Sequence, residues 1–323
     1  MSPENLANSG IVLNVQRFST EDGPGIRTTV FLKGCSLRCD WCQNPESWTL
    51  VPQVVWYKDR CIGARHCLSA CPKQALTLTS RGMVIDRKRC DGCGSCASVC
   101  PPGAIEVLGV RRTVDDVTAE VLRDCVFYEQ SGGGVTLSGG DPLFQFGFAH
   151  ELLRRFRSHG LHTALDTAGY AKQEQFQALV DNSNLVLLDL KLMEPTQHQA
   201  FTGIPLEPIL RNATWLGAQS KPIWIRTPII PGFTDSTDNI KTIATFIREN
   251  LPRVERWDLL GFNKLCISKW QRLDMPFACA DTPLVSIDQM AHLMETARES
   301  LVSRITWSGV TREAMASVQH QLE

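Results

Sequence analysis

Residues 28–42, TTVFLKGCSLRCDWC, join an apolar run to three closely spaced cysteines. The run at 28–32 is rich in β-branched and aromatic residues, which predicts a buried strand. Cys35, Cys39 and Cys42 follow it with the spacing C-x3-C-x2-C. In parallel α/β folds the chemistry lies in loops at the carboxyl ends of strands. We therefore expect this loop to be a functional site.

After residue 113 the chain alternates between strand-like and helix-like segments. Apolar, strand-like runs lie at 135–138, 162–165, 185–190, 223–230, 256–262 and 305–307. Helix-like segments lie at 115–130, 148–159, 172–180, 206–218, 237–250 and 287–302. This alternation predicts an α/β fold with a mostly parallel sheet and helices outside it. About six strand–helix units predict a partial, TIM-like (β/α)6 barrel rather than a closed eightfold one.

Composition excludes several classes of function. The formal charge of −1 over 323 residues gives no basic surplus for binding nucleic acid. No apolar run is long enough to span a membrane, and residues 1–10 lack the features of a signal peptide. We therefore expect a cytoplasmic protein without a membrane partner. Ten of the 13 cysteines lie between positions 35 and 100. In a reducing compartment this clustering indicates ligation or catalysis rather than disulfides.

The first cysteine triplet has the ligands for an iron–sulfur cluster with one open corner. Three thiolates can hold three irons of a [4Fe–4S] cluster, and no fourth cysteine follows nearby. The open iron could then bind a small chelating molecule, such as the amino and carboxylate groups of S-adenosylmethionine (SAM). A structural zinc site is the alternative, but zinc normally takes four ligands, and none follows within a dozen residues.

Two further cysteine groups lie in the middle of the chain. Cys90, Cys93, Cys96 and Cys100 have the bacterial ferredoxin spacing C-x2-C-x2-C-x3-C-P, in which the fourth cysteine ligates the other cluster. A second, shorter set has Ala64 where a cysteine is expected. Crossing the fourth ligands predicts one complete cluster held by Cys71, Cys90, Cys93 and Cys96, and one incomplete set formed by Cys61, Cys67 and Cys100. Residues 54–110 are thus predicted to be a ferredoxin-like insertion, with 1–53 and 111–323 forming the barrel.

The incomplete set leaves three outcomes open. It could hold a three-iron cluster, a labile cluster, or a four-iron cluster completed by a non-cysteine group such as His66. We expect His66 to be a surface residue, because it neighbours Cys67 and does not occupy position 64. The isolated Cys125, Cys266 and Cys279 are expected to be buried hydrophobes.

Residues 34–45, GCSLRCDWCQNP, and the preceding DGPGIRT at 22–28 resemble the activating enzymes of glycyl radical enzymes, a radical SAM family. The resemblance covers about residues 12–310, and a subset of that family is similar in carrying a ferredoxin-like insertion. It implies reductive cleavage of SAM to a 5′-deoxyadenosyl radical, which takes a hydrogen atom from a glycine of a partner enzyme under anaerobic conditions. It also implies auxiliary clusters that relay electrons from a donor such as flavodoxin or ferredoxin, although the clusters could instead mainly brace the insertion.

The resemblance also implies roles for polar residues at the ends of the predicted strands. The expected SAM contacts are Trp41, Gly139, Gly140, Asp141, Asp166, Lys191, Arg226 and Asn263. A monovalent cation is expected at Asp166, Thr167, Asp189 and the Leu187 carbonyl, and partner contacts at Asp22 and Arg27. From the residues alone, the glycines at 139 and 140 allow close approach of a ligand, but a Gly-Gly-Asp-Pro sequence also forms ordinary turns. Two other classes remain: an electron carrier, and a radical SAM enzyme acting on a small molecule or nucleic acid.

Overall fold

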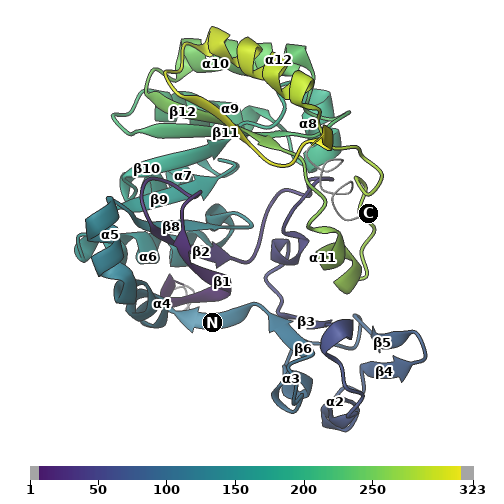
Figure 1. The fold of residues 1–323 in the computed structure, drawn as a ribbon. Coiled ribbons are helices and arrows are strands. Elements are labelled where there is room, and N and C mark those ends of the chain that lie inside the picture. Colours follow the sequence, from purple (N-terminus) through teal and green to yellow (C-terminus); the bar gives the residue numbers. More distant parts are fainter. Residues whose placement is uncertain (1–6, 314–323) are drawn as a thin grey trace.

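A computed structural model describes residues 7–313, which form a nine-stranded sheet with helices outside it (Figure 1). The strands are β1 (Ser9–Ser19), β2 (Arg27–Leu32), β7 (Val110–Thr113), β8 (Gly134–Gly139), β9 (Thr163–Thr167), β10 (Leu185–Asp189), β11 (Ile223–Ile229), β12 (Val254–Gly261) and β13 (Ile305–Ser308). Their order across the sheet is β13-β12-β11-β10-β9-β8-β2-β1-β7. Neighbours from β2 to β13 pair in parallel, and β1 pairs antiparallel with β2 and β7. The sheet has two free edges, β13 and β7, which confirms the predicted α/β fold with an open, parallel centre.

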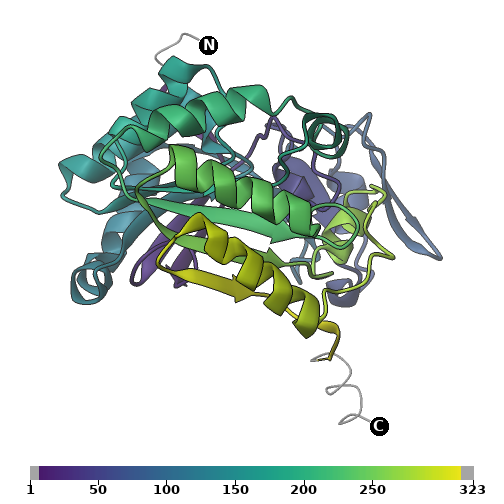
Figure 2. The ribbon, with the colours of Figure 1, turned by 90° about the horizontal axis from the view of Figure 1, so that it is seen from above.

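Helices connect the strands, and most of them cover the outer face of the sheet. They are α4 (Val114–Val121), α5 (Cys125–Ser131), α6 (Phe146–Ser158), α7 (Gln173–Asp181), α8 (Pro195–Thr202), α9 (Glu207–Gly217), α10 (Thr237–Asn250), α11 (Ile267–Arg272) and α12 (Ile287–Ala297). Helix α10 shows the usual pattern, because Ile240, Ile243, Ala244 and Ile247 are buried at helical spacing. In Figure 2 the green α10 and yellow α12 lie side by side over the strands.

Several boundaries differ from the prediction. Strands β1 and β7 were not expected. The helix predicted at 115–130 is interrupted by a 3-10 turn, Leu122–Asp124. Asp124 is buried there because its carboxylate accepts hydrogen bonds from Arg17 and Thr28. The helix predicted at 287–302 ends at Ala297, followed by a 3-10 turn at Arg298–Ser300.

Residues 53–108 form a separate pair of small sheets beside the barrel (Figure 1). The elements are β3 (Gln53–Trp56), α2 (His66–Ala70), β4 (Leu76–Thr79), β5 (Gly82–Ile85), α3 (Ser95–Ser98) and β6 (Ile105–Leu108). Strands β5 and β6 begin 29 residues after β3 and β4 respectively, yet β3 pairs with β6 and β4 with β5. The segment is therefore a repeat of two halves that exchange strands, with an apolar cluster of its own around Val54, Leu76, Ile85 and Ile105.

Candidate active site

The first cysteine triplet lies on the loop that follows β2. Gly34 begins the loop with φ +94°, and a side chain there would meet the Phe144 ring at 2.3 Å, so only glycine fits. Cys35, Cys39 and Cys42 lie close together; burial raises the pKa of all three thiols, to about 12 for Cys39 and about 11 for Cys42. Three thiolates on this loop would need a compensating cation, which iron ligated by them would provide.

A cavity of about 390 Å³ opens beside these cysteines. The three cysteines and Trp41 form one wall, and polar residues at the carboxyl ends of β8 to β11 form the other. Trp41 is buried and packs edge to face against Phe233, with ring centroids 5.8 Å apart. The volume is within the range of small-molecule sites. The cavity therefore has room for a nucleoside-sized ligand in contact with a cluster on this loop.

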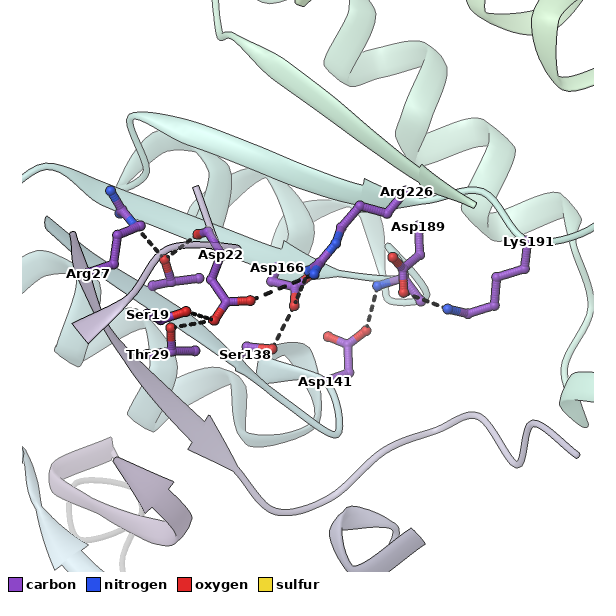
Figure 3. Close-up of polar contacts among 12 residues, drawn as sticks. Ser19, Asp22, Arg27, Thr29, Ser138, Asp141, Asp166, Asp189, Lys191 and Arg226 are labelled. Atoms are coloured by element: carbon purple, nitrogen blue, oxygen red, sulfur yellow. Dashed lines mark hydrogen bonds and ion pairs between the residues drawn. The ribbon is translucent and has the colours of Figure 1, made fainter. Parts of the chain in front are cut away.

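Five charged side chains line this cavity in one row (Figure 3). Arg226 Nη1 lies 2.9 Å from the Asp166 carboxylate, and Nη2 lies 3.7 Å from that of Asp22. Lys191 Nζ lies 2.5 Å from Asp189 Oδ2. Burial raises the pKa of Asp166, and Arg226 opposes this shift. Three carboxylates face two cations, so the row favours a ligand that carries a positive charge, such as an ammonium or sulfonium group.

Asp141 is not among the residues that line the cavity, and its contact with the SAM amino group stays a prediction. Its carboxylate accepts hydrogen bonds from the Leu143 amide at 3.0 Å, the Ala168 amide at 2.9 Å and the Thr167 hydroxyl at 2.9 Å. Asp141 is thus a positioning residue that ties the end of β8 to the end of β9. The neighbouring Gly139 and Gly140 do line the cavity, and a side chain at Gly140 would meet the Gly34 carbonyl at 2.2 Å.

Two other predicted contact residues have partners within this chain. Arg27 is fully buried, and its guanidinium donates to Thr136 Oγ1 at 2.7 Å and to the Val135 and Pro24 carbonyls. It holds the 22–25 loop against β8, and its contact with a partner protein stays a prediction. Asn263 lies outside the cavity, and its side-chain oxygen accepts from the Leu265 amide. Only its carbonyl, which accepts from Gln43, touches the cysteine loop.

The residues predicted to bind a monovalent cation have other contacts. Thr167 donates its hydroxyl to Asp141, and Leu187 lies fully buried in the middle of β10. Asp166 and Asp189 are compensated by Arg226 and Lys191. Protein side chains thus supply the positive charge at this place.

Two tryptophans that pack against the cysteine loop were missed in the sequence. Burial raises the pKa of the Cys42 thiol, and the nearby Trp48 side chain lowers it in part. Trp270, on α11, donates from Nε1 to the Cys42 carbonyl at 3.0 Å. The two rings pack edge to face, 5.1 Å between centroids. Trp270 follows Cys42 by more than 200 residues, so local spacing gives no signal for it.

The other cysteines fall into two groups within residues 53–108. Cys67 lies near Cys61 and Cys100, and these three line one cavity with Ala64. Cys96 lies near Cys71 and Cys90. Both Cys67 and Cys96 are the second residue of a short helix, α2 and α3 respectively, so their positions are equivalent in the two halves. Each group thus combines cysteines from both halves of the repeat.

The sequence model of the Radical SAM superfamily matches residues 29–244, which include the cysteine loop and every strand from β8 to β11. The chain belongs to the radical SAM superfamily. The predicted superfamily is thereby confirmed, and the matched residues include the loop that carries Cys35, Cys39 and Cys42.

Relatives within this radical SAM superfamily are activating enzymes. The chain is 38% identical over 279 residues to the (2S)-3-sulfopropanediol dehydratase activating enzyme of Klebsiella oxytoca, covering 84% of this chain and 88% of the relative. It is 42% identical over 271 residues to the isethionate sulfite-lyase activating enzyme of Desulfovibrio desulfuricans, covering 82% and 86%. A radical SAM methyltransferase from Sphaerobacter thermophilus shares the fold, with a TM-score of 0.52 and 13% identity over 94% of this chain and 80% of that one. Among residues 7–313, no helix has both the length and the apolar character needed to cross a bilayer.

Proposed function

We propose that this radical SAM protein is an activating enzyme that installs a glycyl radical on a partner enzyme. The observation that supports this most directly is the placement of three cysteines at the wall of one cavity that also has a surplus of carboxylates. Relatives at 35–42% identity are activating enzymes by name. By name, these relatives activate a dehydratase, a lyase and a decarboxylase.

The chain's own residues bind and orient the reactants. Cys35, Cys39 and Cys42 hold the [4Fe–4S] cluster, which when bound with SAM supplies the electron and the radical chemistry. The Gly139–Gly140 backbone lines the cavity next to the cluster loop, and Trp41 offers an aromatic face for the adenine. Lys191 and Arg226 suit the SAM carboxylate and ribose, because both are charged and aimed into the cavity. Asp22 lines the same cavity and is the residue we propose to meet the glycyl segment.

Residues 54–110 are proposed to hold auxiliary clusters that pass electrons to the SAM cluster. The strand-exchanged halves and the two crossed cysteine groups support a ferredoxin-like insertion. Cys71, Cys90, Cys93 and Cys96 would hold one cluster, and Cys61, Cys67 and Cys100 the other. The electron donor is proposed to be a flavodoxin or ferredoxin. A monovalent cation near Asp166 stays a prediction, and the surplus of carboxylates over Arg226 and Lys191 in this cavity supports it.

SAM cleavage tests the first part of this function. We expect anaerobically reconstituted protein with dithionite and SAM to release 5′-deoxyadenosine, and Cys35→Ala, Cys39→Ala or Cys42→Ala to lower its formation to background. Cys125→Ala is the matched control, because this half-buried thiol lies on α5, away from the cavity. Full 5′-deoxyadenosine formation by the variant that lacks all three loop cysteines would rule the proposal out.

Glycyl radical formation tests the second part. A glycyl radical enzyme encoded beside this gene is the first partner to try. We expect anaerobic mixing with that enzyme, SAM and reductant to produce the doublet of a glycyl radical in electron paramagnetic resonance. SAM cleavage without a doublet on any glycyl radical enzyme tried would favour a small-molecule substrate instead.

A further inference from the structure

The 29-residue repeat allows the missing cysteine position to be examined against an intact copy. Cys61, Gly63, Ala64, Cys67 and Cys71 correspond to Cys90, Gly92, Cys93, Cys96 and Cys100. The backbone is equivalent: φ is +73° at Gly63 and +74° at Gly92, and +62° at Arg65 and +80° at Gly94, just before α2 and α3. The Ala64 methyl group thus occupies the place of the Cys93 thiol in the other half.

The same correspondence pairs His66 with Ser95. Ser95 Oγ lies 3.5 Å from Cys93 Sγ, so the side chain two positions after the cysteine reaches the ligand atom itself. In the first half the cysteine sulfur is missing and a longer imidazole replaces the serine hydroxyl. Position 66 is therefore directed at the corner of the cluster site that Ala64 leaves without a ligand.

Few other residues that line this cavity could act as a ligand to iron. Cys61, Cys67 and Cys100 line it together with His66, and its other walls are mainly apolar or backbone. Met83 offers only a thioether, a weak partner, whereas imidazole is an established replacement for cysteine in iron–sulfur proteins. His66 is exposed at the cavity mouth, and so is Cys93, the ligand at the equivalent corner of the other half. No three His, Cys, Asp or Glu side chains within residues 7–313 converge tightly enough for a single metal ion, so a cluster is the group that suits this spread of cysteines.

We propose that His66 is the fourth protein ligand of an iron–sulfur cluster held by Cys61, Cys67 and Cys100. This inference rests on the auxiliary clusters of the proposed function and revises the expectation that His66 is a plain surface residue. It selects the four-iron cluster with mixed ligands over the three-iron and labile alternatives. A neutral imidazole in place of a thiolate makes the cluster less negative, which raises its reduction potential relative to an all-cysteine cluster.

The test uses the full chain with Cys35, Cys39 and Cys42 changed to alanine, so that only clusters of the insertion contribute. In this background we expect about eight irons per chain, and pulsed electron paramagnetic resonance of the reduced protein should show a nitrogen coupling typical of a ligating imidazole. His66→Ala should abolish the coupling and leave about seven irons. The matched control, His159→Ala, removes an exposed histidine at the end of α6 and should change neither reading.

A rescue variant separates ligation from general damage. Adding Ala64→Cys to His66→Ala restores the cysteine of the intact half, so we expect the iron content to return to about eight without the nitrogen coupling. Eight irons with no coupling in the parent, a coupling that survives His66→Ala, or about seven irons in the parent would each overturn the proposal. About four irons in the parent would overturn this proposal and the second auxiliary cluster, while 5′-deoxyadenosine formation by the protein with its loop cysteines would still stand.

Discussion

Arg226 lies among three carboxylates inside the barrel, and its own surroundings explain why it must be charged. It contacts Asp166 at 2.9 Å and Asp22 at 3.7 Å, and Asp189 is near enough to interact with it. Burial lowers the pKa of the guanidinium, but these carboxylates raise it further, so the net shift is upward. A buried cation that serves three anions is hard to replace.

Changing Arg226 to methionine is expected to destabilise the fold as well as abolish turnover. The change leaves buried carboxylates without their partner, which costs about 3–5 kcal/mol, measured by urea unfolding. The double variant with Asp166→Asn should recover part of this loss, since one stranded charge is removed with it. Arg211→Met is the control: its ion pair on the surface of α9 is half exposed, and about 0.5 kcal/mol or less is expected. A loss below about 1 kcal/mol for Arg226→Met would contradict this account.

His162 should make the stability of the protein depend on pH. Burial and then the charge of Arg27, 3.4 Å away, lower the pKa of His162 to about 4. As the pH falls, His162 therefore becomes protonated near pH 6.5 in the unfolded chain but only near pH 4 in the folded protein. Stability is fully present above pH 6.5 and falls as the pH drops through this window. We expect the urea midpoint of His162→Gln to fall less between pH 6.5 and 5 than that of the parent, with exposed His159→Gln following the parent. If the urea midpoints of the parent and of His162→Gln fell equally between pH 6.5 and 5, His162 would not be the cause of this pH dependence.

The residues of the site were predictable only in part. Cys35, Cys39 and Cys42 follow from local spacing, because all three lie on one loop. Asp141, Arg27 and Asn263 could be placed near the site from the sequence, but which donors and acceptors they meet depends on the register of neighbouring strands. The Asp141 carboxylate accepts hydrogen bonds from backbone amides of two different segments, and no pattern in the sequence predicts both of them.

At the scale of elements, continuous burial decides what the sequence can predict. The parallel strands β8 to β11 are buried almost throughout, so their apolar runs are visible. Strand β1 is buried over Gly10–Val12 and then largely exposed, and β7 is exposed, so neither has a strong pattern. The break between α4 and α5 was hidden because its cause, a buried contact of Asp124 with β1 and β2, is tertiary.

Helix α11 is a short element that supports the cluster loop from outside. Trp270 Nε1 donates to the Cys42 carbonyl, and Lys269 lies 2.8 Å from the Glu46 carboxylate and 2.6 Å from Asn44 Oδ1. Both residues of α11 thus bind the segment just after the third cysteine. Six residues could not hold a helix in isolation, so packing against Trp48 and these polar contacts keep it in place.

Trp270→Phe is expected to make the SAM cluster more labile with little effect on folding. The ring packing on Trp48 is kept, but one hydrogen bond to the loop is lost, worth about 1 kcal/mol. Release of iron to a chelator from reconstituted protein should be several-fold faster. Trp307→Phe, in the partly exposed edge strand β13, is the matched control and should release iron at the parent rate. Equal rates of iron release from Trp270→Phe and Trp307→Phe would show that α11 does not stabilise the cluster loop.

At the scale of the whole molecule, contacts between residues far apart in the sequence hold the insertion against the barrel. Lys33, fully buried at the start of the cluster loop, donates to the Glu46 carbonyl and, at 3.0 Å, to Gln53 of β3. On the other side Arg87 binds the Val54 carbonyl of the insertion, the Arg272 carbonyl at 2.6 Å and Asp274 at 3.0 Å. Arg272 in turn stacks over the Tyr57 ring, 4.8 Å from its centroid. Repeated contacts of this kind hold the insertion against α11, and hence against the side of the cluster loop that α11 supports.

If the insertion passes electrons to the SAM cluster, loosening this joint should affect only electron delivery. Arg87→Met removes the bonds to Arg272 and Asp274 without touching any cysteine. Dithionite is a small reductant that can reach the SAM cluster by itself. With dithionite we therefore expect Arg87→Met to form 5′-deoxyadenosine at the parent rate. With a reduced flavodoxin or ferredoxin the rate should fall several-fold, because electron transfer slows steeply as the two bodies separate. Arg81→Met, at the exposed β4–β5 turn of the same insertion, should leave both rates unchanged. An equal fall with both reductants would mean that the insertion braces the barrel, and that its clusters are not the route by which the electron arrives.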